Sequence, residues 1–89
     1  MIWSPSLELE ETIKLIISDS FDLSYDEVTL DTGPSNTDSW DSFGQMDLVL
    51  KIEKEFDIIL EFEEIFKIVS AQTLLEVIED KLNESRKER

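Results

Sequence analysis

Apolar residues recur every three or four positions in three separate stretches of this chain, which is the spacing of one face of an α-helix. The clearest case is Leu48, Ile52 and Phe56, at i, i+4 and i+8. Only 2 glycines and 2 prolines occur among the 89 residues, too few for the many turns of an all-β fold. This length limits the chain to one small domain. The sequence therefore predicts an all-α fold around a single core.

Two of the expected helices lie in the first two thirds of the chain. Ser4 and Pro5 are typical of a helix start, because serine caps a helix and proline fits its first turn. The residues that follow predict a first helix from about Ser6 to Ser20, and a second helix is expected from Ser42 to about Phe56. The apolar stripes behind these predictions are Leu9, Ile13, Ile16, Ile17 and Phe21 in the first helix, and Leu48, Ile52 and Phe56 in the second, with Val49 at its border.

The end of the chain holds a short helix and a last long one. The segment 63–68 is long enough for one or two helical turns. Ser70 is a suitable cap for a last helix, whose stripe is Leu74, Ile78 and Leu82. Residues 83–89 are polar and charged, and we expect them to fray. The predicted organisation is a single domain over residues 1–84, with three main helices and one short helix, followed by a charged tail over 85–89.

A long loop separates the first two helices. Helical periodicity fades between Asp22 and Asp41, and residues 32–39 include no apolar side chain. Loops of this length in a compact domain are usually functional or mobile. We expect the loop to be pinned to the core by Leu23, Val28, Leu30 and Trp40. The later segment 57–62 resembles a strand, but a lone strand has no pairing partner, so we favour an extended connection that buries Ile58 or Leu60.

The charge and the missing residue types exclude several functions. The chain has 8 Lys and Arg against 22 Asp and Glu, a net charge of −14, so it repels nucleic acids and anionic membranes and suits protein partners with basic patches. Cysteine and histidine are absent, which excludes thiolate metal sites, disulfides and Ser-His or His-metal enzymes. No signal peptide or membrane-length apolar run occurs. The sequence predicts a soluble, cytoplasmic monomer with no metal site.

The second helix has two apolar faces. Because a helix turns about 100° per residue, Phe43, Met46 and Leu50 lie roughly opposite the stripe assigned to the core. Asp47 and Lys54 lie on the same side. An exposed apolar strip bordered by charge is typical of a docking site for a protein partner. The alternative is that the long loop folds over this strip and hides it.

The start of the second helix carries the most informative motif, Trp40-Asp41-Ser42-Phe43. With the helix behind it, this motif resembles the acyl carrier protein and peptidyl carrier protein family. That family is an acidic four-helix bundle whose serine is esterified to 4′-phosphopantetheine. The resemblance is densest over 41–57 and covers about 70 residues, reaching back through Ile13, Ile17 and Val28 and forward through Glu63, Glu64 and Ile68.

Two serines compete for the modified position, since Asp38-Ser39-Trp40-Asp41 also resembles the family motif. The family has an acidic residue five after its serine and large apolar residues six, ten and fourteen after it. Counted from Ser42 these are Asp47, Leu48, Ile52 and Phe56, and all four fit. Counted from Ser39 they are Gly44, Gln45, Val49 and Glu53, and only one fits. The spacing assigns the attachment to Ser42. The plain alternative is that Ser42 only caps the helix.

The resemblance implies a carrier and not an enzyme. A phosphopantetheinyl transferase would load the arm from coenzyme A, and acyl or aminoacyl groups would be held on it as thioesters. The partners would be acyl-loading and acyl-processing enzymes. The second helix would recognise them through Phe43, Met46 and Leu50, and through the charged residues Asp41, Asp47, Glu53, Lys54 and Glu55. Such charges mainly speed and select encounters.

Departures from the family pattern bear on the pathway. Ser39-Trp40-Asp41-Ser42-Phe43-Gly44 stands where the common fatty-acid version has Gly-Ala-Asp-Ser-Leu-Asp. These differences favour a specialised lipid, polyketide, non-ribosomal peptide or related pathway. Two other hypotheses stay open. One is a carrier-like adaptor subunit with Ser42 unmodified, and the other is an unrelated acidic helical protein such as a nucleic-acid mimic or a divalent-ion binder. Against tight ion binding, no Asp-x-Asp-x-Asp-Gly loop is present.

Overall fold

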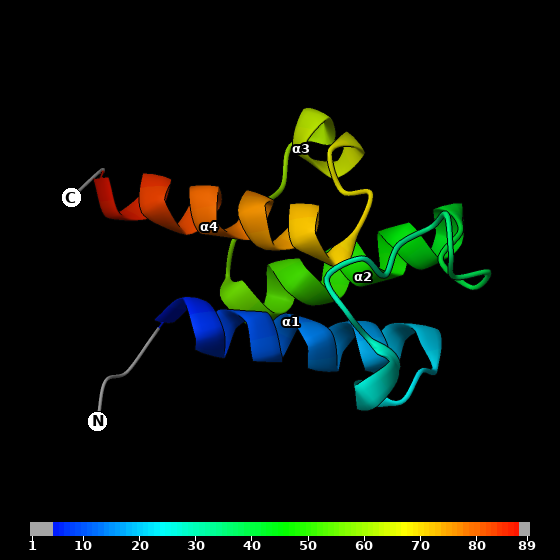
Figure 1. Cartoon of the computed structure of the whole chain (residues 1–89). Helices are drawn as coiled ribbons and strands as arrows, with labels where there is room; N and C mark the ends of the chain where they lie inside the picture. The colour runs from blue at the N-terminus through cyan, green and yellow to red at the C-terminus, as the bar shows by residue number, and fades with distance from the viewer. Residues whose placement is uncertain (1–4, 88–89) are drawn as a thin grey trace, which may run out of the picture.

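The protein is a bundle of three long helices with one short helix at its side (Figure 1). The structure is a computed structural model that describes residues 5–87, with side chains described for 8–83. The helices are α1 (Pro5–Phe21), α2 (Ser42–Phe56), α3 (Phe62–Phe66) and α4 (Ala71–Lys87), and a 3-10 turn, η1, spans Tyr25–Glu27. The described residues include no strand. The predicted all-α bundle is confirmed.

The core lies between the three long helices, where α1 packs against both α2 and α4. The largest fully buried side chains come from all three helices and from the end of the long loop. They are Trp40, Ile13, Ile17, Leu48, Ile52, Leu74, Ile78 and Val49. The stripes expected from the sequence are thus the ones that face inward, with Leu9, Ile16, Phe56 and Leu82 half-buried at the edges.

The boundaries of the long helices agree closely with those expected. The second helix runs from Ser42 to Phe56 as predicted, and α1 extends one residue beyond the expected range at each end. The proposed cap at Ser4 lies outside the described residues. The polar end of the chain differs from expectation, because α4 stays helical through Asn83 and on to Lys87. Among the described helices, none is both long and apolar enough to cross a membrane.

Left-handed aspartates end the first two helices. Asp22 has φ 56° and Asp57 has φ 55°, a region that non-glycine residues seldom adopt. After each of them the chain folds back on the helix. The Leu23 N–H donates to the Ser18 carbonyl over 3.0 Å, and the Ile58 N–H donates to the Glu53 carbonyl over 3.2 Å. These bonds satisfy carbonyl groups at the helix ends, as in the usual left-handed helix termination.

The long loop is fastened to the start of α4. The carbonyls of Leu30 and Thr32 accept the N–H groups of Gln72 and Ala71, over 3.0 and 2.8 Å. The first N–H groups of any helix have no partner within the helix, and these bonds satisfy two of them in α4. Gly33 makes the approach possible, since a Cβ there would lie 2.3 Å from the Val69 carbonyl oxygen. The predicted pins are confirmed: Val28 and Trp40 are buried, and Leu23 and Leu30 are half-buried.

The connection between α2 and α4 carries α3 on its way. Its first part is extended and buries Leu60, with Ile58 half-buried, so the prediction of an extended connection over a strand is confirmed. The short helix begins at Phe62, one residue before the expected segment. The carboxylate of Glu64 accepts from Lys81 Nζ over 2.9 Å, which joins α3 to α4.

Candidate functional site

Asp41 supplies the cap of α2. Its backbone is extended, with φ −102° and ψ −166°, and its Oδ1 accepts the Gly44 N–H over 2.9 Å. Its carbonyl accepts the Gln45 N–H over 2.7 Å, which closes the first turn. This arrangement is the usual N-cap geometry of aspartate. The interpretation of Ser42 as a plain cap is therefore wrong, because the capping oxygen belongs to the residue before it.

Ser42 is the first residue of α2, and its side chain is exposed. Within the described part of the chain, no residue forms a hydrogen bond with its hydroxyl. Ser39 differs in this respect, because its Oγ donates to the Phe21 carbonyl over 3.4 Å and ties the loop to the end of α1. The structure thus leaves Ser42 with the freer of the two neighbouring hydroxyls.

Gly44 lets the serine turn pack closely against the end of α1. A Cβ at this position would lie 2.6 Å from the Phe21 Cε1 atom and 2.6 Å from the Ser39 carbonyl oxygen. Real Cβ atoms do not approach other heavy atoms this closely, so a larger residue would displace the turn that carries Ser42. Sequence reasoning did not assign Gly44 a role. The signal for it is a glycine inside the first turn of a helix, where the backbone has no need of one.

Gln45 joins three elements next to Ser42. Its Oε1 accepts the indole N–H of Trp40 over 2.5 Å, and its Nε2 donates to the Ile65 carbonyl over 3.1 Å and the Ile68 carbonyl over 3.4 Å. Trp40 is itself buried and stacks on Phe21, with 4.7 Å between ring centroids and 15° between planes. Sequence reasoning missed Gln45, because two of its three partners, Ile65 and Ile68, lie 20 or more residues away in the chain.

The apolar strip on α2 is exposed. Phe43, Met46 and Leu50 have exposed fractions of 88%, 49% and 61%. The long loop does not hide them, so the alternative in which it folds over the strip is wrong. This leaves three large apolar side chains of one helix in contact with solvent.

The charged residues of α2 divide into outward and inward groups. Asp47 is exposed and pairs with Lys51 over 3.3 Å, and Lys51 also pairs with Asp19 of α1 over 3.2 Å. The hydrogen bond with Asp19 raises the pKa of Lys51 above its ordinary value; burial opposes this, and Asp47 adds to it. Lys54 and Glu55 are exposed.

Glu53 was expected to contact partner enzymes, but the structure places its carboxylate in a contact within the chain. It is half-buried, and its Oε2 accepts the Leu60 N–H over 2.9 Å. The carboxylate thus holds the extended connection against α2. Sequence reasoning treated Glu53 as an outward charge, and it missed this contact because Leu60 lies beyond the end of the helix.

A groove of about 530 Å³ runs from Ser42 toward α3. Met46 and Phe66, both exposed, are among its lining residues. Phe66 meets Phe62 edge to face, with 4.9 Å between ring centroids. Most of the lining is apolar. Its residues are Pro34, Trp40, Asp41, Ser42, Gln45, Met46, Phe62, Ile65, Phe66 and Ile68.

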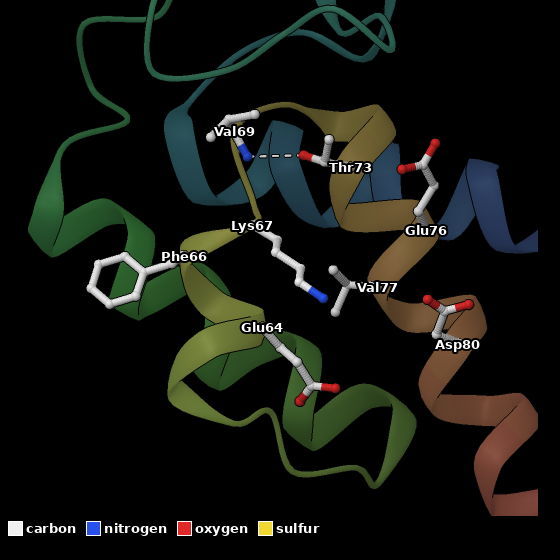
Figure 2. A pocket seen from close by; sticks show the side chains of 8 residues that line it. All are labelled: Glu64, Phe66, Lys67, Val69, Thr73, Glu76, Val77 and Asp80. Carbon is white, nitrogen blue, oxygen red and sulfur yellow. Dashed lines mark hydrogen bonds between the residues drawn. The ribbon is translucent and has the colours of Figure 1, made fainter.

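A second hollow of about 460 Å³ lies between α3 and α4 (Figure 2). Its lining mixes both signs of charge, and Lys67 extends into it from the end of α3 toward Val77. The Val69 N–H donates to Thr73 Oγ1 at its upper edge over 2.8 Å. No residue of α2 lines it. Its full lining is Glu64, Phe66, Lys67, Val69, Thr73, Glu76, Val77 and Asp80.

Comparison with known proteins identifies relatives over most of the chain. No family model matches it. The acyl carrier protein of Petrotoga mobilis is 37% identical over 76 residues, which are 85% of this chain and 89% of that protein. The acyl carrier protein of Cyanidium caldarium is 30% identical over 76 residues, 85% of this chain and 88% of that protein. With an all-helical bundle and near-complete coverage of both relatives, the chain belongs to the acyl carrier protein family, whose members are carriers and not enzymes.

Proposed function

We propose that this chain holds acyl groups as thioesters on a 4′-phosphopantetheine arm joined to Ser42, and presents them to partner enzymes. The observation that carries the proposal is the state of the Ser42 hydroxyl. It is exposed at the first residue of α2, and the described residues offer it no hydrogen-bond partner. Asp41 takes over the capping that a serine in this place would otherwise perform.

The first turn of α2 fits the phosphodiester that such an arm brings. The Gly44 and Gln45 N–H groups are satisfied by Asp41. The N–H groups of Ser42 and Phe43 donate to no described residue. Free N–H groups at the positive end of a helix stabilise a nearby anion. This chain therefore offers both the nucleophilic oxygen and a favourable setting for the charge that follows.

The attachment step uses coenzyme A, a divalent cation and a transferase. Ser42 Oγ gives up its proton, which is released to solvent, and forms a bond to the phosphorus that bears the pantetheine. The pyrophosphate linkage of coenzyme A breaks, and adenosine 3′,5′-bisphosphate leaves. The attached arm supplies a terminal thiol, which forms thioesters with acyl or aminoacyl groups and makes up for the absence of cysteine in the chain. Asp41 and Gly44 fix the backbone of the turn that carries Ser42.

The exposed strip on α2 is the surface we propose for partner enzymes. Phe43, Met46 and Leu50 supply apolar contact next to the modified serine. Asp41, Asp47 and Glu55 supply negative charge for basic docking patches on partner enzymes. Lys54 is also exposed on this helix but carries a positive charge. Glu53 is the weakest of the proposed contacts, because its carboxylate is bonded to Leu60.

We further propose a specialised pathway, in lipid, polyketide or related synthesis. The support is the segment 39–44, which departs from the common fatty-acid pattern in the residues on both sides of Asp41-Ser42. Mass spectrometry of the thioester on protein from its native source identifies the cargo. A cargo limited to ordinary straight-chain fatty acyl groups contradicts this part of the proposal.

The test of the carrier role is labelling in vitro. The chain is incubated with coenzyme A, Mg²⁺ and a promiscuous phosphopantetheinyl transferase, and its mass is measured. We expect a single gain of one phosphopantetheinyl group, lost in Ser42→Ala. The matched control is Ser39→Ala, three residues away, which is expected to label normally. No gain in the wild-type chain, together with a stoichiometric partner in pull-downs, would instead favour the unmodified adaptor.

A further inference from the structure

Few contacts hold α3 against the rest of the bundle, so each of its hydrogen bonds contributes strongly to its position. The helix has 5 residues, too short to be stable alone. Phe62 and Phe66 project into solvent, so the inward contacts come from Ile65 within the helix and from Leu60 and Ile68 at its sides. Outside these apolar contacts, α3 is held to α4 by the Glu64–Lys81 pair and to α2 by Gln45.

The Gln45 carboxamide is hydrogen-bonded through both its oxygen and its nitrogen, and these partners fix its orientation. The Trp40 indole N–H is a donor only, so it must face the carboxamide oxygen. The carbonyls of Ile65 and Ile68 are acceptors only, so they must face the carboxamide nitrogen. Both ends of one side chain are thus in use, one on the loop before α2 and the other on α3.

The loop side of this link is rigid. Trp40 is only 2% exposed and stacks on Phe21 of α1. Its indole N–H has Gln45 as acceptor, and its backbone lies two residues before Ser42. The link therefore runs from α1 through Trp40 and Gln45 to α3, and Trp40 and Gln45 are among the residues that line the groove beside Ser42.

We propose that Gln45 is a positioning residue that latches α3 against α2 and so sets how readily the groove beside Ser42 opens. When the latch is closed, the carboxamide holds the C-terminal end of α3 over the groove. When it breaks, α3 loses the bonds from Gln45 to the Ile65 and Ile68 carbonyls and keeps the pair with Lys81, the Glu53–Leu60 bond just before the helix, and its apolar contacts. A group tethered to Ser42 would enter or leave this groove more easily when α3 moves, and this consequence rests on the proposed function. The latch between Gln45 and α3 does not depend on the proposed function.

Two variants separate the halves of the latch. In Gln45→Glu the carboxylate still accepts from the Trp40 indole, but it presents oxygen to the Ile65 and Ile68 carbonyls, so only the α3 half breaks. In Gln45→Met both halves break with little change in side-chain volume. The matched control is Ile17→Val, which weakens the core of α1 and leaves the latch intact.

The measurement is native-state hydrogen exchange by NMR on the full unmodified chain, so its outcome is independent of any failure to label Ser42. The Ile68 N–H, bonded to the Ile65 carbonyl over 3.1 Å, reports opening of α3. We expect it to exchange about tenfold faster in both Gln45 variants and at the wild-type rate in Ile17→Val. The Trp40 indole N–H is expected to stay protected in Gln45→Glu and to lose protection in Gln45→Met. Wild-type exchange at Ile68 in either Gln45 variant, or loss of the fold in both, overturns the latch.

Discussion

At the scale of single residues, the serine turn is built from two neighbours that carry no chemistry of their own. Asp41 caps the helix, and Gly44 allows the turn to approach Phe21 and the Ser39 carbonyl more closely than any side chain would permit. Each of them fixes the backbone on one side of Ser42. The position of the Ser42 hydroxyl therefore depends on Asp41 and Gly44, which a search for reactive groups would not identify.

Replacing Gly44 by alanine tests this dependence. Alanine favours helix by about 1 kcal/mol over glycine in an exposed position. Here its Cβ would meet two atoms at 2.6 Å, and we expect overpacking to outweigh the gain, with a net loss of about 1–3 kcal/mol in the free energy of unfolding. Urea denaturation measures the change.

The control for this variant is Ser42→Ala, in the same turn but exposed, for which we expect a change within about 0.5 kcal/mol. If Gly44→Ala is as stable as the wild-type chain, the close contact with Phe21 is not a constraint on the turn.

At the scale of elements, α3 is tied to α4 by a pair that responds to pH. Burial raises the pKa of Glu64, but the Glu61 N–H and the ammonium of Lys81, with Lys67 nearby, lower it by more, so the net pKa lies below its ordinary value of 4.5. A depressed pKa contributes stability that is complete above the ordinary value and is lost as the pH falls through the folded one. The tie between α3 and α4 therefore weakens in acid.

Comparing the wild-type chain with Glu64→Gln isolates this contribution. We expect the wild-type chain to be more stable by up to about 1 kcal/mol at about pH 6, and the difference to shrink as the pH falls below the ordinary glutamate pKa of 4.5. Thermal unfolding followed by circular dichroism across this range supplies the curve. Glu63→Gln, an exposed neighbour on the same helix, serves as control and is expected to show a smaller dependence. A difference that grows toward acid pH would reverse the assigned sign.

Some features of the helices could be predicted from the sequence and others could not. A feature was predictable when the residues that determine it lie within the same stretch of chain. The stripe of Leu48, Ile52 and Phe56 determines α2 within its own sequence, and its predicted bounds agree with the structure. The left-handed caps at Asp22 and Asp57 were not predictable, because aspartate rarely adopts that conformation and nothing adjacent demands it. The helical backbone of 83–87 was missed because those residues lack an apolar stripe.

The candidate site follows the same division. Ser42 was singled out through the resemblance to the carrier family, and its role as the attachment site stays a prediction. The strip of Phe43, Met46 and Leu50 was predicted from spacing within one helix, and these side chains are exposed. The roles of Gly44, Gln45 and Glu53 were not, because each depends on a distant segment: Gly44 on Phe21, Gln45 on Ile65 and Ile68, and Glu53 on Leu60. Contacts between segments require the fold itself.

At the scale of the whole molecule, the net charge of −14 is confined to a body with a Cα radius of gyration of 12.8 Å. At about 10 mM salt the Debye length is about 30 Å, so carboxylates across the molecule repel one another, whereas at about 150 mM it falls to about 8 Å. Self-repulsion of this kind destabilises the compact state. Salt is therefore expected to stabilise this protein.

We expect the melting temperature to rise over that range of NaCl, with each 1 kcal/mol gained corresponding to about 4–8 °C. Differential scanning calorimetry measures it. The double variant Asp38→Asn with Glu63→Gln, which removes two exposed charges, is expected to show a smaller rise. A melting temperature that falls with salt would mean that attractive pairs such as Lys51–Asp19 dominate the surface.

The fastening of the long loop to α4 has a consequence for anyone who redesigns this chain. Residues 32–39 show no helical periodicity, so an engineer would readily choose this loop to graft a foreign peptide. Yet the oxygens that complete the beginning of α4 belong to Leu30 and Thr32, 42 and 39 positions upstream of their donors Gln72 and Ala71. An insert beside Gly33 would therefore disturb the first turn of α4 as well as the loop itself.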